Sequence, residues 1–241
     1  MSALGLAWEQ FRFERKLFWR NPSAAFFNFL LPLLLLVLIG SVYGDDQDLL
    51  DVLVPGIAGM SVMASTFTSL AYQVTYLREE GILKRVRGTP LPTPSFVAGM
   101  VGSAVANAFA QVALVIAIGN LLFGVDWPAH PLSLVAFTAL GVLCFGALGV
   151  AFSHAIPNVD SGPAYVNAVF LPLIFISGVF YEAESLPPVL EAIGEALPLK
   201  HLIDCLSYAI VGGDYAVTAP AVVAGWAVAG MVVAVRWFRW D

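Results

Sequence analysis

Residues 78–92 hold the densest run of ionisable side chains in this sequence of 241 residues, and the chemistry open to them is ion pairing. They read Arg-Glu-Glu-Gly-Ile-Leu-Lys-Arg-Val-Arg-Gly-Thr-Pro-Leu-Pro. A loop that only orients a membrane protein needs bases, whereas this one also carries two glutamates and three apolar side chains between the charges. Such a mixture on a short helix, ended by Gly88 and Pro90, favours a protein contact over a solvated loop.

The sequence contains no phosphate-binding loop. That loop needs the pattern Gly-x-x-x-x-Gly-Lys-Ser/Thr to cradle phosphates, and none of Lys16, Lys84 and Lys200 follows a glycine. We therefore expect no cofactor on this chain. Any ATP and Mg²⁺ that supply energy are expected on a partner subunit.

The residues for catalysis do not form a recognisable set either. An intramembrane enzyme needs, for example, a serine with a histidine or paired aspartates at membrane depth, but His130, His154 and His201 fall at the ends of apolar runs. Cys144 and Cys205 give no metal-binding spacing. We predict a transport subunit, not an enzyme, with no catalytic and no metal site.

The charged segment lies between apolar runs. The sequence has six such runs, and each is close to the ~20 residues that a helix needs to cross a bilayer. The sequence is 59% hydrophobic and 12% charged, against roughly 45–50% and 25% in soluble domains. We predict an all-α integral membrane protein, with one transmembrane domain over residues 1–241. Its expected transmembrane helices cover 24–43, 52–76, 96–124, 132–153, 162–181 and 217–235.

The distribution of Lys and Arg predicts the orientation, because cytoplasmic loops carry the excess of both. Bases precede the first run, lie at 78–87, and follow the sixth run at Arg236 and Arg239. The alternate gaps are acidic, with Lys200 as their one base. Both termini are therefore expected in the cytoplasm, and the protein in the inner (plasma) membrane. The net charge of −6 sums two opposite faces and does not indicate nucleic acid.

Residues 1–22 form an amphipathic segment. Trp8 and Phe11 belong to an apolar set at helical spacing, opposite bases that include Arg12 and Arg15. We expect a helix along the inner leaflet, with its aromatic rings at the acyl boundary and its bases near anionic lipid headgroups. Such a helix is either a plain membrane anchor or a docking surface for a cytoplasmic protein.

Residues 182–214 are too long for a simple turn. They contain two short apolar helices, each roughly half the length of a span, divided by Pro198. The segment is either a surface loop lying flat on the membrane or a plug at the external end of a pathway. For such a gate we single out Phe180, Tyr181, Leu186, Pro198, His201 and Asp204.

Charged residues do not occur deep in the six runs, which disfavours coupling to protons or sodium and favours a hydrophobic or amphiphilic cargo. Polar residues there mostly form hydrogen bonds between helices, each contributing about 0.6–2 kcal/mol. The candidates for a substrate path are Asn28, Thr66, Asn107 and Asn167. Two alternatives that need no ATPase stay open: a channel or carrier, and a regulatory or immunity membrane protein without transport.

The residue order over 78–92 resembles the segment that follows the second span in type-2 ABC transporter permeases. Arg20 to Pro22 resembles that family before the first span, as do Pro172 to Tyr181 and Pro198 to Asp204 further along. Within the family the chain is similar to small permeases of bacterial drug and polyketide-lipid exporters. Many relatives carry an arginine soon after the aspartate that corresponds to Asp204, whereas this chain has no base at Cys205 to Tyr208. A role that depends on that arginine is therefore not expected here.

The resemblance implies a six-helix permease that dimerises, with itself or a related permease, and sits on two copies of an ABC ATPase. It implies multidrug or lipid export, meaning outward movement of a drug, lipid or lipid-linked product. Residues 1–22 would be an interfacial helix, 78–90 a coupling helix, and 182–214 an external re-entrant hairpin. The expected contacts with the ATPase are Arg78, Glu79, Glu80, Lys84, Arg85 and Arg87.

Overall fold

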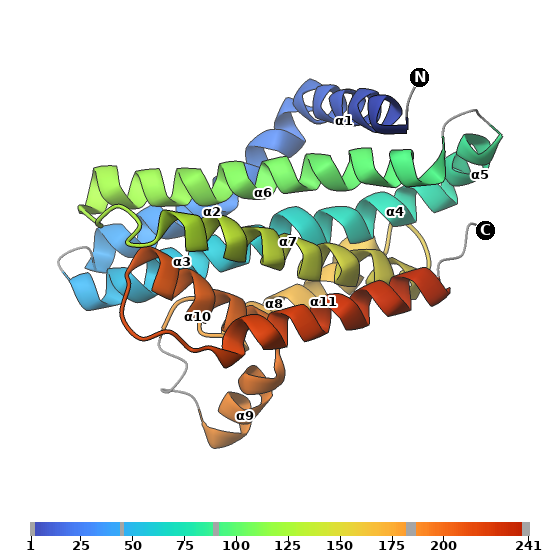
Figure 1. The fold of residues 1–241 in the computed structure, drawn as a ribbon. Helices are drawn as coiled ribbons and strands as arrows, with labels where there is room; N and C mark the ends of the chain where they lie inside the picture. The colour runs from blue at the N-terminus through green and yellow to red at the C-terminus, as the bar shows by residue number, and fades with distance from the viewer. Residues whose placement is uncertain (1–2, 44–45, 89–91, 182–186, 238–241) are drawn as a thin grey trace.

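The computed structural model describes residues 3–43, 46–88, 92–181 and 187–237, which form helices and short connections (Figure 1). The α-helices are α1 (Ala3–Arg20), α2 (Pro22–Tyr43), α3 (Gln47–Met63), α4 (Ser69–Glu79), α5 (Ile82–Arg87), α6 (Thr93–Phe123), α7 (Pro131–Phe152), α8 (Gly162–Ile176), α9 (Pro188–Ala196), α10 (Pro198–Ile210) and α11 (Thr218–Trp237). A π-helical turn, Ala64–Thr68, joins α3 to α4, and a 3₁₀ turn, Ser153–Ala155, follows α7.

Four helices in the described ranges are long and apolar enough to cross a membrane: Gln47–Glu79, Ser95–Phe123, Pro131–Ala155 and Thr218–Arg236. Two shorter apolar helices, Asn28–Tyr43 and Gly162–Ile176, accompany them. The predicted class, an all-α integral membrane protein, is confirmed for the part of the chain that the structure describes.

The centre of the bundle is the continuous helix formed by α3, the π-helical turn and α4. It packs against α6, α7 and α10, and most of its side chains are buried. The hydroxyls of Ser61, Ser65 and Thr66 donate to backbone carbonyls one turn earlier, at 2.6–2.8 Å. These bonds satisfy polar groups in an environment without water, so the helix stays continuous among apolar neighbours.

Two bounds differ from the predicted spans by five residues, and the others by three or fewer. The second span was expected over 52–76, but the helix begins at Gln47 because the Asp46 carboxylate caps it, accepting the backbone N–H of Leu49 at 3.2 Å. The fifth span was expected over 162–181, but α8 ends at Ile176. Gly178 follows with a φ of 73°, a left-handed conformation that ends helices and suits glycine.

The coupling helix predicted over 78–90 is also shorter in the structure. Arg78 and Glu79 belong to the end of α4, and α5 contains only Ile82–Arg87. Gly81 lies between them with a φ of 66°, which breaks the helix. Residues 89 and 90 of the predicted segment lie outside the described residues.

The two ends of the bundle carry different elements (Figure 1). The start of α1, the helix α5 and the end of α11 lie at one end, while the start of α3 and the connection from α6 to α7 lie at the other. The helix α1 runs along the outside of α6. The start of α1 and the whole of α5 therefore lie at the same end of the molecule.

The helix α10 is inserted among α3, α7 and α11, toward the end opposite α5 (Figure 1). Its apolar side chains, Leu202 and Leu206 among them, are buried. The last turn of a helix leaves carbonyls without intrahelical partners. Here the carbonyls of Ala209 and Ile210 accept the backbone N–H groups of His130 and Ala129, at 2.9 and 3.0 Å. The connection from α6 to α7 thus closes the buried end of α10.

Candidate functional site: a charged end helix and two stacked cavities

The helix α5 is attached to the bundle by its apolar side. Leu83 is buried in a cluster with Leu77 and Phe96, from α4 and α6. On the other side Lys84 and Arg85 are exposed. The bundle therefore fixes the position of α5 and leaves two bases accessible at its surface, as a partner contact requires.

Two of the residues predicted to contact an ATPase are engaged inside this chain. The Arg78 guanidinium donates to the carbonyls of Ser153 and Ile156, at 3.2 and 2.6 Å, and the Glu79 carboxylate accepts the N–H of Val159. Carbonyls at a helix end lack partners, so a nearby arginine satisfies them. These two side chains tie the base of α5 to the segment that leads from α7 into α8. Glu80 is exposed, and the side chain of Arg87 lies outside the described part.

The helix α1 directs polar side chains toward the bundle. Glu14 is 8% exposed, and its carboxylate accepts the amides of Gln10 and Gln73, each at 2.9 Å. Burial raises the pKa of Glu14, and the two amide hydrogen bonds partly offset the increase. Arg15 donates to Asn107 Oδ1 on α6. This buried polar contact joins α1 to α4 and α6.

The outward surface of α1 carries both apolar and charged side chains. Trp8 is exposed and stacks on Phe11 with ring centroids 5.1 Å apart, while Arg12 is exposed beside Glu9 at 3.4 Å. Arg15 lies against the bundle instead of the lipid headgroups that the sequence suggested, because its partly buried guanidinium needs the acceptor that α6 provides. An apolar aromatic surface on a helix suits the boundary between lipid and water.

Replacing Glu14 tests this contact. Glu14→Ala leaves two partly buried amides without their acceptor and is expected to destabilise the protein by about 1–3 kcal/mol. Glu14→Gln keeps an acceptor and removes the buried charge. Because the folded-state pKa of Glu14 lies above its ordinary 4.5, native stability falls as pH rises through that range. Thermal unfolding should therefore show Glu14→Gln at or above native stability at pH 7.5, with the difference lost near pH 4. A native advantage at pH 7.5 would contradict the assignment.

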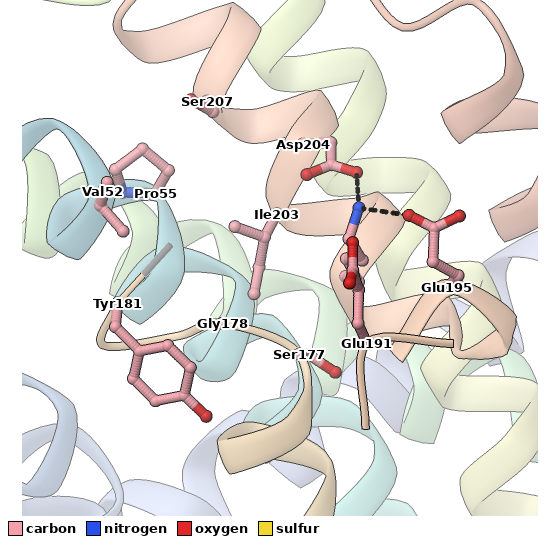
Figure 2. Close-up of a pocket in the computed structure, with 11 residues that line it drawn as sticks. Val52, Pro55, Ser177, Gly178, Tyr181, Glu191, Glu195, Ile203, Asp204 and Ser207 are labelled. Atoms are coloured by element: carbon pink, nitrogen blue, oxygen red, sulfur yellow. Dashed lines mark ion pairs between the residues drawn. The ribbon is translucent and has the colours of Figure 1, made fainter. Parts of the chain in front are cut away.

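A polar cavity of about 320 Å³ lies where the turn after α8 meets α3, α9 and α10 (Figure 2). Within it the Lys200 ammonium lies 3.3 Å from Glu195 Oε1 and 3.5 Å from Asp204 Oδ2. Burial lowers the pKa of Lys200, but the two carboxylates together outweigh it and raise that pKa. Burial raises the pKa of Asp204, and the Lys200 charge opposes that rise. The Lys200 ammonium is thus held charged between two acidic groups.

An apolar cavity of about 560 Å³ lies further along α3 and α8, and many of its other lining residues come from α7 and α11. Leu173 lines the apolar cavity, and Ser177, one helical turn further along, lines the polar cavity. On α3 and the π-helical turn, Pro55 faces the polar cavity, whereas Met63 and Phe67 face the apolar one. The two cavities are therefore stacked along the bundle, with the polar one nearer the end opposite α5.

Most residues predicted for the external gate gather where α8, α9 and α10 meet. Tyr181 and Asp204 line the polar cavity, and Pro198 lines the apolar cavity. His201 Nε2 lies 2.8 Å from the carbonyl oxygen of Glu195, and Phe180 packs near Phe175. Leu186 lies outside the described residues. Their role as a gate stays a prediction.

The four residues predicted for a substrate path lie apart from both cavities. Asn28 and Asn107 bind side chains of neighbouring helices, and Thr66 donates to a carbonyl of its own helix. Asn167 is exposed on α8. Three of them thus act as hydrogen-bonding groups within the bundle, and contact with a substrate stays a prediction for all four.

Sequence reasoning missed Glu14, Ser177 and Glu191. Glu14 occupies a helix on which most other charged residues are exposed, so its type alone gave no signal of burial. Ser177 and Glu191 enter the polar cavity only because the turn after α8 folds against α9. The one available signal was Lys200, a lone base within an acidic segment.

The described residues form a bundle of apolar helices with exposed bases at one end, which is the architecture of an integral membrane protein. Comparison with known protein families gives a match over most of the chain: residues 6–211 match the model of the ABC-2 type transporter family. The chain belongs to that family and is a transmembrane ABC transport permease, as its sequence predicted.

Several named bacterial proteins are similar to the chain. The inner membrane transport permease YadH of Escherichia coli K12 is 29% identical over 181 residues, covering 73% of this chain and 69% of that protein. The daunorubicin resistance ABC transporter permease protein DrrB1 of Streptomyces coeruleorubidus is 29% identical over 186 residues, covering 71% and 63%. Nodulation protein J of Neorhizobium galegae is 27% identical over 180 residues, covering 73% and 66%.

Proposed function

We propose that this chain is the permease subunit of an ATP-driven exporter that moves a hydrophobic or amphiphilic molecule outward, powered by a separate ATPase. One connected arrangement carries the proposal. The exposed bases of α5 are joined through Arg78 and Glu79 to the segment before α8, and α8 with its following turn lines both cavities. A push on α5 by a partner would therefore reach the cavities through hydrogen-bonded backbone.

The chemistry of the cavities supports the class of cargo. An apolar cavity beside a smaller charged one fits a molecule with an apolar body and a polar group. The similarity to the daunorubicin resistance permease DrrB1 supports the same class of cargo. Two copies of the permease on two copies of the ATPase would complete the transporter, with ATP and Mg²⁺ bound by the ATPase.

Rigid-body motion is the proposed coupling. Closure of the ATPase pair on ATP would move α5, and α4 and α8 would move with it because Arg78 and Glu79 bridge them. Six transmembrane helices, including α2 and the shorter α8, and a re-entrant α9–α10 hairpin at the external end belong to this proposal. The burial of α10 among three helices supports the hairpin, because free backbone groups at membrane depth need protein partners.

The orientation proposed here places α5 and both termini in the cytoplasm, and cysteine labelling tests it. The native Cys144 and Cys205 are buried and should give little background. In right-side-out vesicles, an impermeant maleimide is expected to label Asp126→Cys at once and Lys84→Cys only after permeabilisation. The reverse pattern would overturn the orientation.

Transport in reconstituted vesicles tests the function itself. The permease and its co-purified ATPase are expected to accumulate a fluorescent amphiphile in an ATP-dependent manner, with no accumulation of a small hydrophilic anion. Accumulation of the amphiphile without ATP would favour the alternative of a channel or carrier. Absence of any transport by an active ATPase complex would favour a regulatory or immunity role.

A further inference from the structure

The polar cavity carries an excess of negative charge. Its lining contains three carboxylates, Glu191, Glu195 and Asp204, against the ammonium of Lys200. Lys200 pairs with Glu195 and Asp204, whereas Glu191 has no ion-pair partner among the described residues. Partly buried carboxylates are stabilised by a nearby cation. The cavity therefore has the charge to hold one further positive group.

Ser177 gives an independent indication of a ligand. Its side chain is 1% exposed, and its hydroxyl has no hydrogen-bond partner among the described residues. Buried polar groups in folded proteins are nearly always hydrogen-bonded. Ser177 lines the polar cavity, and Figure 2 shows its hydroxyl oxygen pointing away from the α8 ribbon, on the side where Glu191 lies. A ligand N–H group in the cavity would satisfy this oxygen, because a hydroxyl accepts as well as donates.

A metal ion suits this lining less well than an amine. No group of three His, Cys, Asp or Glu side chains in the described ranges is placed to hold a metal ion. The Lys200 ammonium occupies the space between two of the carboxylates, where it would repel a divalent cation. A protonated amine instead donates directional hydrogen bonds to carboxylate and hydroxyl oxygens.

The apolar cavity indicates the chemistry of the remaining part of the ligand. Its lining comes close to that of the polar cavity on two elements, at Leu173 and Ser177 and at Pro198 and Lys200. Apart from His154 its lining is aliphatic and aromatic, with Phe67 and Phe145 among its members. A molecule with an apolar body and an amine at one end has the two kinds of group that these neighbouring cavities suit.

We infer that the polar cavity binds the protonated amine of a cationic amphiphile, between Glu191 and Ser177, with its apolar part in the adjoining cavity. The direction in which such a ligand moves rests on the proposed function, whereas its binding does not. The amine could belong to the cargo or to the headgroup of an amino-phospholipid, since both present the same ammonium group.

The test measures binding to the full chain in phosphatidylcholine nanodiscs, together with any ATPase that co-purifies, because a bilayer without net charge does not attract the cationic probe by itself. The probe is dodecylammonium with a dansyl group at the far end of its alkyl chain, and its N-acetyl derivative is the uncharged comparison. The native protein is expected to bind the charged probe at least about tenfold more tightly, a typical effect of a charge-assisted hydrogen bond. Glu191→Gln and Ser177→Ala should each reduce that preference severalfold, whereas Asp126→Asn, an acidic residue outside the cavity, should not.

Equal binding of the two probes, or an unchanged preference in Glu191→Gln, would overturn the inference. Adding phosphatidylethanolamine to the nanodiscs separates the two sources of the amine: competition with the probe identifies the lipid headgroup, and no competition identifies the cargo. Selective binding without ATP-driven transport would contradict the proposed function and leave the amine site standing. ATP-driven transport without selective binding of the charged probe would overturn the amine site and leave the proposed function standing.

Discussion

Replacing Lys84 and Arg85 with glutamate is expected to reduce the ATPase that co-purifies with the permease by about tenfold or more. Placing like charges together across an interface costs several kcal/mol, and about 1.4 kcal/mol corresponds to tenfold in affinity. Both side chains are exposed and make no ion pair within the described ranges, so their reversal should leave the fold intact. The readout is the ratio of ATPase subunit to permease in the eluate, with thermal unfolding measured in parallel.

The matched control is Arg236→Glu, which reverses an exposed base at the same end of the bundle but on α11. It is expected to retain the ATPase. If the α5 variant retains the ATPase as fully as this control does, α5 is not the contact and the coupling scheme built on it is wrong.

Adding a methyl group at Gly56 is expected to be the most damaging small change in the centre of the bundle. A Cβ on Gly56 would lie 2.0 Å from the carbonyl oxygen of Val179 and 2.8 Å from its carbonyl carbon. These are backbone atoms, so no side chain can rotate away, and α3 must separate from the segment after α8. Overpacking costs about 1–3 kcal/mol and occasionally more, and Gly56→Ala should reach at least the upper part of that range.

The effect of Gly56→Ala on stability is measured by thermal unfolding in detergent and by the yield of folded protein. Gly225→Ala is the matched control, because a Cβ there meets nothing within 4 Å and α11 is helical. It should leave stability unchanged or raise it by up to about 1 kcal/mol, since alanine favours helices over glycine. Equal stability of both variants would show that α3 and the turn after α8 are not in close contact.

The sequence was sufficient for the bundle, because each apolar run carries its own length and hydrophobicity signal. The residues at which the helices begin and end depended on single side chains, which a hydrophobic pattern averaged over many residues does not reveal. Asp46 extends the second helix backward by capping it, and Gly81 splits the predicted coupling helix in two. The inward side of α1 was hidden for a further reason. In a membrane protein the outward side of a helix can be the apolar one, so Glu14 and Arg15 face the bundle while Trp8 is exposed.

The candidate site was predicted in part. The bases of α5 and the gate residues Tyr181 and Asp204 stand out by charge and type, and the structure places them at α5 and in the polar cavity. The cavity as a whole could not be foreseen, because α3, the turn after α8, α9 and α10 bring together residues more than a hundred positions apart. The inward contacts of Arg78 were equally hidden, since their acceptors are backbone carbonyls and any residue supplies those.

Affinity capture of the native chain from detergent-solubilised membranes tests the central claim most directly. The eluate is assayed for a second subunit and for ATP hydrolysis. An ATP-binding subunit that co-purifies and hydrolyses ATP is the predicted result. A pure permease dimer that carries no ATPase, yet still transports in vesicles, would contradict an ATP-driven permease.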